Sequence, residues 1–552
     1  MTWSEGVRKS TGLLIGAGAS YELGLPLVWE LTTELKNWLT SEKLRGFNAG
    51  WREQGGGHPD EVIEDFASVL ERSDLHYEAL LGYLETQWRR QRSFAQHYHE
   101  LYSWLVQMTY HLLYARQINN AGYLARHLPL FDGIKSLTDG GKTLRIFSLN
   151  HDVMIEAIAA RLGIPLHSGF GPATITLPLR DEAGILKGRL NAAVLDGATI
   201  ERGTMPFPNP PEPGIYLLKI HGALDVFAFN DGKDLLKLMP DGDGPEGVIA
   251  ALRAANEDLR YIQPGLPSGR VGALNEIAYA DDDGVMQFLR RTLLAGAFKF
   301  DVRRSQVLPV RMLEHFRANL NFVDRLICIG YGFGDLHINT ALREWLDASA
   351  HRSLEIVNPG IREIPSGLLH LAPQITLSQS GAADWFDDEA GIERPQNQIM
   401  LKQVSAAMRK LGPVLGQKAS AAYLAQRQQS AMDRLIVHLK GLPKVGGKPD
   451  LGSIEDAEAT VHKLATDLKT TEDEIMAGLL AYLEAELLRR RRRNETDLDP
   501  TRPDGPRAGG RWWASDRDSR PYRLHGLDRR HPLRGGRRHR RGEVVDHRPD
   551  QG

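Results

Sequence analysis

The apolar residues of this chain gather in short continuous runs, each followed by a glycine or polar turn and then by a helical pattern. Such runs occur in LLIGAGASYELGLP (13–26), TLRIFSLN (143–150), GIYLLKIHGALD (214–225), VDRLICIGYGFGD (323–335) and SLEIVNPG (353–360). Strands that alternate with helices in this way indicate a parallel α/β sheet, which binds ligands at the carboxyl ends of its strands. We therefore predict a Rossmann-like parallel sheet whose strand-end turns converge on one crevice.

Helical and irregular segments connect these strands. The stretch LVWELTTELKNWL after the first turn has leucines at helical spacing, and residues 60–117 predict two or three helices. DVMIEAIAARLG predicts a helix that ends at Gly163. Residues 165–215, rich in Gly, Pro and Thr, predict loops with short strands, and residues 228–310 predict an irregular insertion.

Beyond about residue 395 the pattern is helical, with capping boxes in SIED and TTEDE and a linker at 440–452. From Arg489 to the end, arginine outnumbers acidic residues 19 to 10, lysine is absent, and no apolar periodicity is present. Such a composition cannot bury a core. We expect the tail 489–552 to be disordered or to derive from an out-of-frame reading of a GC-rich gene. We leave a role in nucleic-acid binding open.

Composition limits the class of protein. The chain has 552 residues, 42% of them hydrophobic, which is enough for more than one domain. Cys328 is the only cysteine, so the chain can form neither an internal disulfide nor a four-cysteine zinc module. No stretch approaches the ~20 apolar residues of a membrane span. Arg8 and Lys9 before a short apolar run resemble a secretory signal only faintly, and we expect a cytoplasmic protein.

The first turn has the chemistry of a nucleotide-binding loop. A strand that ends in Gly16-Ala17-Gly18 and continues as a helix can leave backbone N–H groups pointing at open space, where a phosphate can bind. The usual dinucleotide fingerprint needs a third glycine at position 21, where this chain has Tyr21. The turn therefore predicts nucleotide binding of a kind other than that of ordinary dehydrogenases.

Four motifs lie at the ends of predicted strands: GAGAS, SLNHD, KIHG and IGYGFGD. Each of them alone is a weak signal of function. Their order and spacing resemble the sirtuin-like NAD-binding fold, in particular the bacterial branch that hydrolyses NAD in antiphage defence, over roughly residues 10–360. The resemblance implies Asn150 and His221 as catalytic residues. It implies NAD contacts at Gly16, Ala17, Gly18, Ser20, Pro26, Asp152, Gly330, Tyr331, Gly332 and Asn358.

The resemblance also implies a domain organisation. Residues 1–394 would form the NAD-binding domain, with a helical insertion at about 60–117. Residues 395–488 would form a smaller helical C-terminal region before the tail. The chain departs from protein deacylases of this fold: Leu27-Val28-Trp29 replaces their Asp-Phe-Arg, and the zinc-binding cysteines are absent. His151 also stands where a tyrosine is usual.

These residues suit cleavage of the bond between nicotinamide and ribose. Nicotinamide leaves as a neutral group, so the site must orient the ribose and polarise a nucleophile. Asn150 can hold a water or a ribose hydroxyl, and His221 can act as a base near neutral pH. Asp152 can accept a hydrogen bond from the ligand or cap the following helix. As alternatives, the Asn-His-Asp turn is also typical of a helix N-cap, and His221 can be a structural histidine.

Other polar residues receive simpler interpretations. Asp335 and His337 have no third ligand nearby in the sequence, so we expect no metal. Tyr331 and Phe333 are more typical of packing than of base stacking. His151 and His167 are not expected to take part in the chemistry.

The sequence thus predicts an NAD hydrolase that depletes NAD to abort infection, with NAD as substrate. The alternatives are a non-catalytic sensor or scaffold that binds NAD or ADP-ribose and, less favoured, an NAD-dependent protein deacylase. Because uncontrolled NAD hydrolysis would kill the host, we expect a homo-oligomer gated by a partner ATPase or a phage-derived trigger. The helical residues 61–117 or 395–490 are the segments expected to carry that regulation.

Overall fold

The computed structural model describes residues 10–203, 205–263, 270–293, 311–396, 398–399 and 402–403, together with strands at 444–445 and 448–449. All of them fall within one compact unit, Met1–Arg489. The predicted helical region 395–488 and the tail 489–552 lie almost entirely outside the described residues. Of the linker at 440–452, the structure describes β14 (Lys444–Val445) and β15 (Lys448–Pro449), which pair antiparallel.

A seven-stranded parallel sheet forms the centre of the fold, as predicted. Its strand order is β13-β12-β11-β1-β2-β6-β3, and every neighbouring pair is parallel. The strands are β1 (Thr11–Ile15), β2 (Thr143–Ser148), β3 (Leu166–His167), β6 (Gly214–Lys219), β11 (Arg325–Ile329), β12 (Ser353–Val357) and β13 (Ile375–Ser378).

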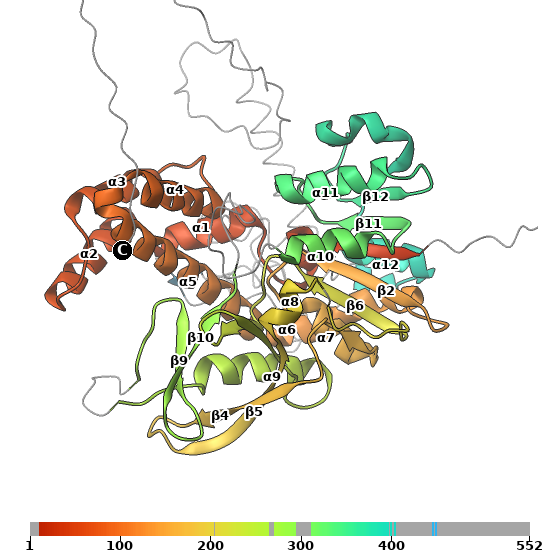
Figure 1. The fold of residues 1–552 in the computed structure, drawn as a ribbon. Helices are drawn as coiled ribbons and strands as arrows, with labels where there is room; N and C mark the ends of the chain where they lie inside the picture. The colour runs from red at the N-terminus through yellow and green to blue at the C-terminus, as the bar shows by residue number, and fades with distance from the viewer. Residues whose placement is uncertain are drawn as a thin grey trace, which may run out of the picture. The chain divides into compact units, whose positions relative to one another are not determined.

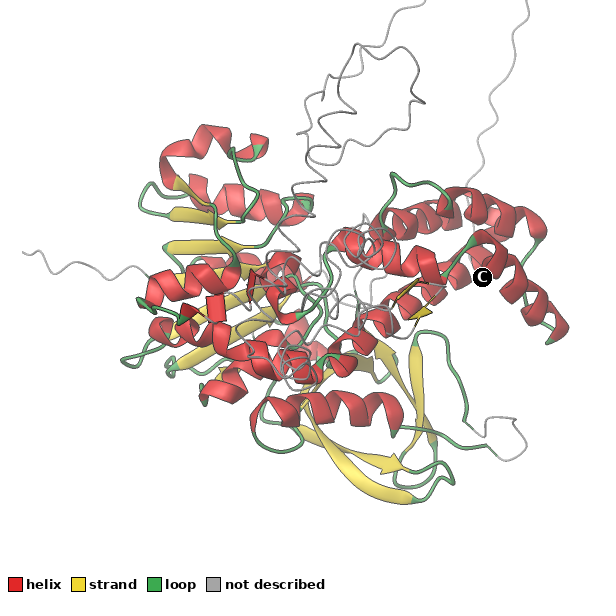
Figure 2. Cartoon of the chain, turned by 180° about the vertical axis from the view of Figure 1, so that it is seen from behind, coloured by secondary structure: helices red, strands yellow, loops and turns green. Residues whose placement is uncertain are grey.

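Helices cover both faces of this sheet (Figure 2), so its strands are buried on both sides and contain almost uninterrupted apolar residues. Leu13 and Ile15 of β1 belong to the core on one face, with α7 (Met154–Leu162), η3 (Leu128–Leu137, a 3₁₀ helix) and α12 (Ala382–Ala390). Leu14 belongs to the core on the other face, with α10 (Arg311–Leu320), α11 (Leu336–Asp347) and η4 (Ser366–Gln374).

The insertion between β1 and β2 is helical, and it is longer than predicted. The segment at 60–117 forms three helices, α3 (Asp60–Leu70), α4 (Tyr77–Arg90) and α5 (Ala95–Asn119). They are preceded by η1 (Ala17–Leu23), α1 (Val28–Trp38) and α2 (Ser41–Glu53), joined by η2 (Arg92–Phe94), and followed by α6 (Ala121–His127). Figure 1 shows α1 to α5 gathered into one helical layer.

A second sheet corrects the expectation of an irregular insertion at 228–310, and residues 165–215, expected as loops with short strands, contribute two strands to it. It is antiparallel, in the order β4-β5-β8-β7-β10-β9. Its strands are β4 (Thr174–Arg180), β5 (Leu186–Leu195), β7 (Val226–Phe229), β8 (Asp234–Leu238), β9 (Glu276–Ala280) and β10 (Met286–Arg291). Two helices, α8 (Gly197–Glu201) and α9 (Gly244–Glu257), lie between these strands in the sequence. Figure 1 shows α9 beside this sheet.

The turn after β6 connects the two sheets. β6 lies in the parallel sheet, and β7, which begins at Val226, lies in the antiparallel one. Ile220–Asp225 therefore occupies the junction, where the KIHG motif was identified. None of the described helices combines the length and the apolar character that a bilayer crossing requires.

Candidate active site

The four motif turns follow adjacent strands, as predicted. GAGAS follows β1, SLNHD includes the end of β2, KIHG the end of β6, and IGYGFGD the end of β11. These strands are consecutive in the sheet, in the order β11-β1-β2-β6, and all are parallel. Because parallel strands end at the same edge, the four turns lie at one edge of the sheet.

The glycine turns after β1 and β11 pack against each other through their backbones. Gly16 N donates to Ile329 O and Gly18 N to Gly330 O, each at 2.9 Å. A Cβ on Gly330, whose φ is +67°, would lie 2.2 Å from Ala19 N. The expectation that this turn leaves its N–H groups open is therefore wrong for Gly16 and Gly18, because the neighbouring turn supplies their acceptors.

Asn150 ties the β2 turn to the β1 turn. Its Nδ2 donates to Gly16 O and to Ser20 Oγ, both at 2.9 Å, and the side chain is 8% exposed. The carbonyl of Gly16 can only accept, so it fixes the orientation of the amide. In the part of the chain that the structure describes, no protein group donates to Asn150 Oδ1, so this oxygen is the atom that can face a ligand.

Ser20 and Asp152 continue this network. Ser20 Oγ donates to Asp152 Oδ2 at 2.7 Å, and Asp152 Oδ1 accepts from Met154 N at 2.9 Å, at the start of α7. Burial raises the pKa of Asp152, and Lys219 and Ser20 partly offset the increase. Both predicted NAD-contact residues thus have structural partners, and Asp152 has the helix-capping role that the sequence left open.

His221 pairs with Asp335. The imidazole is 2% exposed, and its Nε2 lies 3.2 Å from Asp335 Oδ2. The other oxygen of Asp335 accepts from the backbone N–H groups of His337 and Ile338 and caps α11. The two residues belong to separate motifs in the sequence, which did not predict their pairing.

This pair crosses the sheet edge. β6 and β11 are separated by β1 and β2, so their axes lie about 14 Å apart at the usual strand spacing. The loop from Gly330 to Asp335 and the His221 side chain together bridge that distance. The pair therefore spans the ends of β1 and β2, and both predicted catalytic side chains are buried.

Gly222 and His151 fix the turn that carries His221. Gly222 has a φ of +80°, and a Cβ there would lie 1.9 Å from Thr292 O, so no larger residue fits. Its carbonyl lies 3.4 Å from His151 Nδ1, and Leu224 N donates to His151 O at 2.8 Å. His151, expected to take no part, therefore holds the β2 turn against the β6 turn.

The remaining predicted ligand residues differ in accessibility. Tyr331 is buried, its ring packs on Phe333, and its hydroxyl donates to Asn339 Oδ1 at 2.8 Å, so its side chain packs as the sequence suggested. Pro26 is buried as well. A Cβ on Gly332 would meet nothing within 4 Å. Asn358 follows β12, and its Oδ1 accepts from Gly360 N at 2.8 Å in a local turn.

Four buried charges beside the site were not predicted. Lys237 Nζ lies 2.7 Å from Glu156 Oε1 and bonds to Asp225, and Lys219 Nζ lies 3.0 Å from Glu156 Oε1. Lys219 also donates to the carbonyl of Asp152. Burial disfavours a charged ammonium at Lys237, but Asp225 and Glu156 outweigh it and raise its pKa. This set, which we call the buried quartet, has no net charge.

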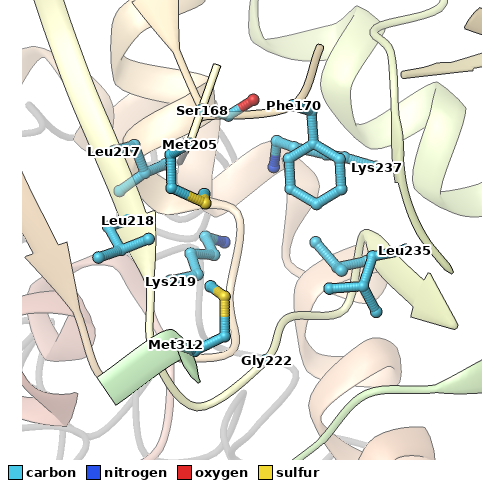
Figure 3. A pocket seen from close by; sticks show the side chains of 11 residues that line it. Ser168, Phe170, Met205, Leu217, Leu218, Lys219, Gly222, Leu235, Lys237 and Met312 are labelled. Atoms are coloured by element: carbon cyan, nitrogen blue, oxygen red, sulfur yellow. The ribbon is translucent and has the colours of Figure 1, made fainter. Parts of the chain in front are cut away.

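A small pocket, partly open to solvent, adjoins β6 (Figure 3). It contains none of the predicted site residues, and most of its lining is apolar. Its two ammonium groups, Lys219 and Lys237, belong to the neutral quartet, so the cavity suits an uncharged group better than a phosphate. The lining residues are Ser168, Phe170, Met205, Leu217, Leu218, Lys219, Gly222, Val226, Leu235, Lys237 and Met312.

A scan against models of known protein families finds no match for this chain, and a search of curated proteins finds none either.

Proposed function

We propose that this protein hydrolyses NAD to nicotinamide and ADP-ribose, with His221 as general base. The pairing of His221 with Asp335 is the observation that carries the proposal. His221 Nε2 lies 3.2 Å from Asp335 Oδ2, so a carboxylate adjoins the buried imidazole. Such a carboxylate would stabilise the imidazolium that forms when the ring takes a proton from a ribose hydroxyl or from water.

Asn150 supplies the second contact in this proposal. Its N–H groups are used by Gly16 O and Ser20 Oγ, so its Oδ1 acts as an acceptor at a fixed position. A fixed acceptor can orient a hydroxyl or the attacking water without titrating. Nicotinamide leaves as a neutral group, so the reaction needs no general acid at the leaving nitrogen.

The burial of His221 supports a gated enzyme. At 2% exposure the imidazole is closed to bulk solvent, so NAD can reach it only after a movement of the surrounding chain. Control of that movement by a partner ATPase, a phage-derived trigger or assembly into a homo-oligomer would restrict NAD loss to infected cells. The role in antiphage defence rests on the family resemblance.

The same burial favours one alternative, a non-catalytic sensor that binds NAD or ADP-ribose. In a sensor, His221 and Asp335 would only join the turns after β6 and β11. The two functions differ in one respect that can be measured: a sensor binds NAD and returns it intact.

NAD turnover and NAD binding should be measured together for the wild type, His221→Ala and Asn150→Ala, with and without the products of neighbouring genes. We expect His221→Ala to abolish turnover while retaining binding, and His167→Ala, a control outside the site, to retain both. Asn150→Ala also removes two structural hydrogen bonds, so its folding should be checked by circular dichroism. Unchanged turnover in His221→Ala would overturn the assignment.

A further inference from the structure

Three side chains of metal-binding type meet in the helical insertion, outside the strand-end site. His58 lies in the connection between α2 and α3, and His97 and Glu100 lie one turn apart on α5. The two Nδ1 atoms are 3.2 Å apart, and His58 Nδ1 is 3.7 Å from Glu100 Oε2. All three ligand atoms lie within 4.8 Å of one another.

These distances suit a tetrahedral ion. Zn²⁺ binds imidazole nitrogen and carboxylate oxygen at about 2.0–2.2 Å, which separates neighbouring ligand atoms by about 3.3–3.6 Å. The separations of 3.2 and 3.7 Å are close to this range, so an ion would need only small side-chain movements. Two imidazoles and one carboxylate are ligands that Zn²⁺ and similar divalent ions accept.

The surroundings hold these ligands in place. Asn48 bonds to both the N–H and the carbonyl of His58, at 2.7 and 3.1 Å, and Trp51 packs its ring edge-to-face with His58. Gln96 donates to Glu100 Oε1 at 2.9 Å and leaves Oε2 directed at the histidine.

We propose that His58, His97 and Glu100 bind a divalent transition-metal ion of the Zn²⁺ class. The ion clamps the α2–α3 connection, which is rich in glycine at positions 55 to 57, to the first turns of α5. Three protein ligands leave a fourth position for water or for a group from a partner. The site is independent of the proposed NAD chemistry.

The test is a Zn²⁺ titration of the chelator-treated full-length protein against a competing chromophoric chelator, repeated with Co²⁺ to record its visible absorption. The control is His99→Gln, which alters a histidine of the same helix that packs on Trp88. We expect tight binding in the wild type and His99→Gln. In His97→Gln and Glu100→Gln it should weaken more than about 100-fold, since even the loss of a residue that only bonds to a metal ligand costs about 10–100-fold in metal affinity.

The chain has 19 histidines, so the comparison of variants, and not the stoichiometry, decides the outcome. Zn²⁺ should also raise the Tm of the wild type and of His99→Gln but not of His97→Gln, and circular dichroism verifies that each variant is folded. Equal Zn²⁺ affinity in wild type and His97→Gln would overturn the proposal. Absence of tight Zn²⁺ binding in the wild type would also overturn it and leave the two histidines as a hydrogen-bonded pair.

Discussion

Two sets of buried polar residues lie at the end of β6, and they differ in the kind of charge that they hold. In the buried quartet, two ammonium groups face two carboxylates, and Glu156 and Asp225 each contact both lysines. In the second set, His221 faces a carboxylate oxygen of Asp335, and an imidazole is not a permanent ion. Removing one member of the quartet would leave a buried charge uncompensated, whereas an imidazole beside a carboxylate can exchange a proton.

Asp225→Asn should produce the largest change in stability. It leaves Lys219 and Lys237 with only Glu156, and breaking a buried ion pair costs about 3–5 kcal/mol. Urea unfolding of the full-length protein measures this loss. Lys233→Met, an exposed lysine four residues before Lys237, should change the unfolding free energy by less than about 0.5 kcal/mol. A similarly small change in Asp225→Asn would show that the quartet does not stabilise the junction.

Asp335→Asn, in contrast, should change the stability of the protein little and its NAD turnover strongly. Asparagine retains an oxygen that can cap α11, so the unfolding free energy should fall by less than about 1 kcal/mol. NAD turnover should fall about 10²- to 10⁴-fold, because a neutral amide does not stabilise the imidazolium. Turnover equal to that of the wild type in a folded Asp335→Asn variant would contradict the base assignment.

Gly330 and Gly332 lie in the same motif, but only Gly330 is packed closely against another segment of the chain. Gly330→Ala places a Cβ 2.2 Å from Ala19 N at a φ of +67°, so we expect a loss of about 2–4 kcal/mol in thermal or urea unfolding. Gly332→Ala meets open space and should cost less than about 0.5 kcal/mol. Equal losses in the two variants would show that the β1 and β11 turns do not depend on this close contact.

Asp152→Asn should produce the smallest effect on stability. The effect should be visible only when stability is measured as a function of pH. Burial raises the pKa of Asp152 in the folded state, so its contribution to stability is greatest below the unfolded pKa of about 3.9 and is lost as pH rises through the folded pKa. Asparagine does not titrate, so Asp152→Asn should not lose stability in this way as the pH rises. Tm measured from about pH 4 upward should therefore fall less steeply in the variant, and parallel curves would contradict the shift.

The sequence predicted the parallel sheet because its strands are buried on both faces. Runs such as LLI and LICI are continuously apolar, and each ends in a recognisable turn. The antiparallel sheet was missed because β5 mixes exposed and buried positions and β4 contains Pro178. The pairs β4–β5, β7–β8 and β9–β10 are hairpins, but β5–β8 and β7–β10, which join them into one sheet, pair across long sequence separations and leave no local pattern.

The sequence predicted His221 and Asn150 as site residues but not their partners, and it singled out Asp335 only as a residue that was not expected to bind a metal. Asp335 meets His221 only because its loop crosses two intervening strands, and the sheet order that sets this distance leaves no local signal. The quartet is equally non-local, since Glu156 and Lys237 are far apart in the chain. The His97-x-x-Glu100 spacing on a helix was a readable signal, but its third member, His58, became evident only in the folded structure.

NAD incubated with the purified full-length protein, alone and with the products of neighbouring genes, can be followed by mass spectrometry. If His221 and Asn150 share one catalytic crevice, nicotinamide and ADP-ribose will accumulate in equal amounts as NAD disappears. His221→Gln will bind NAD and release neither product. Quantitative recovery of intact NAD from wild-type protein that binds it, under every condition, would contradict the proposed hydrolase and favour the sensor.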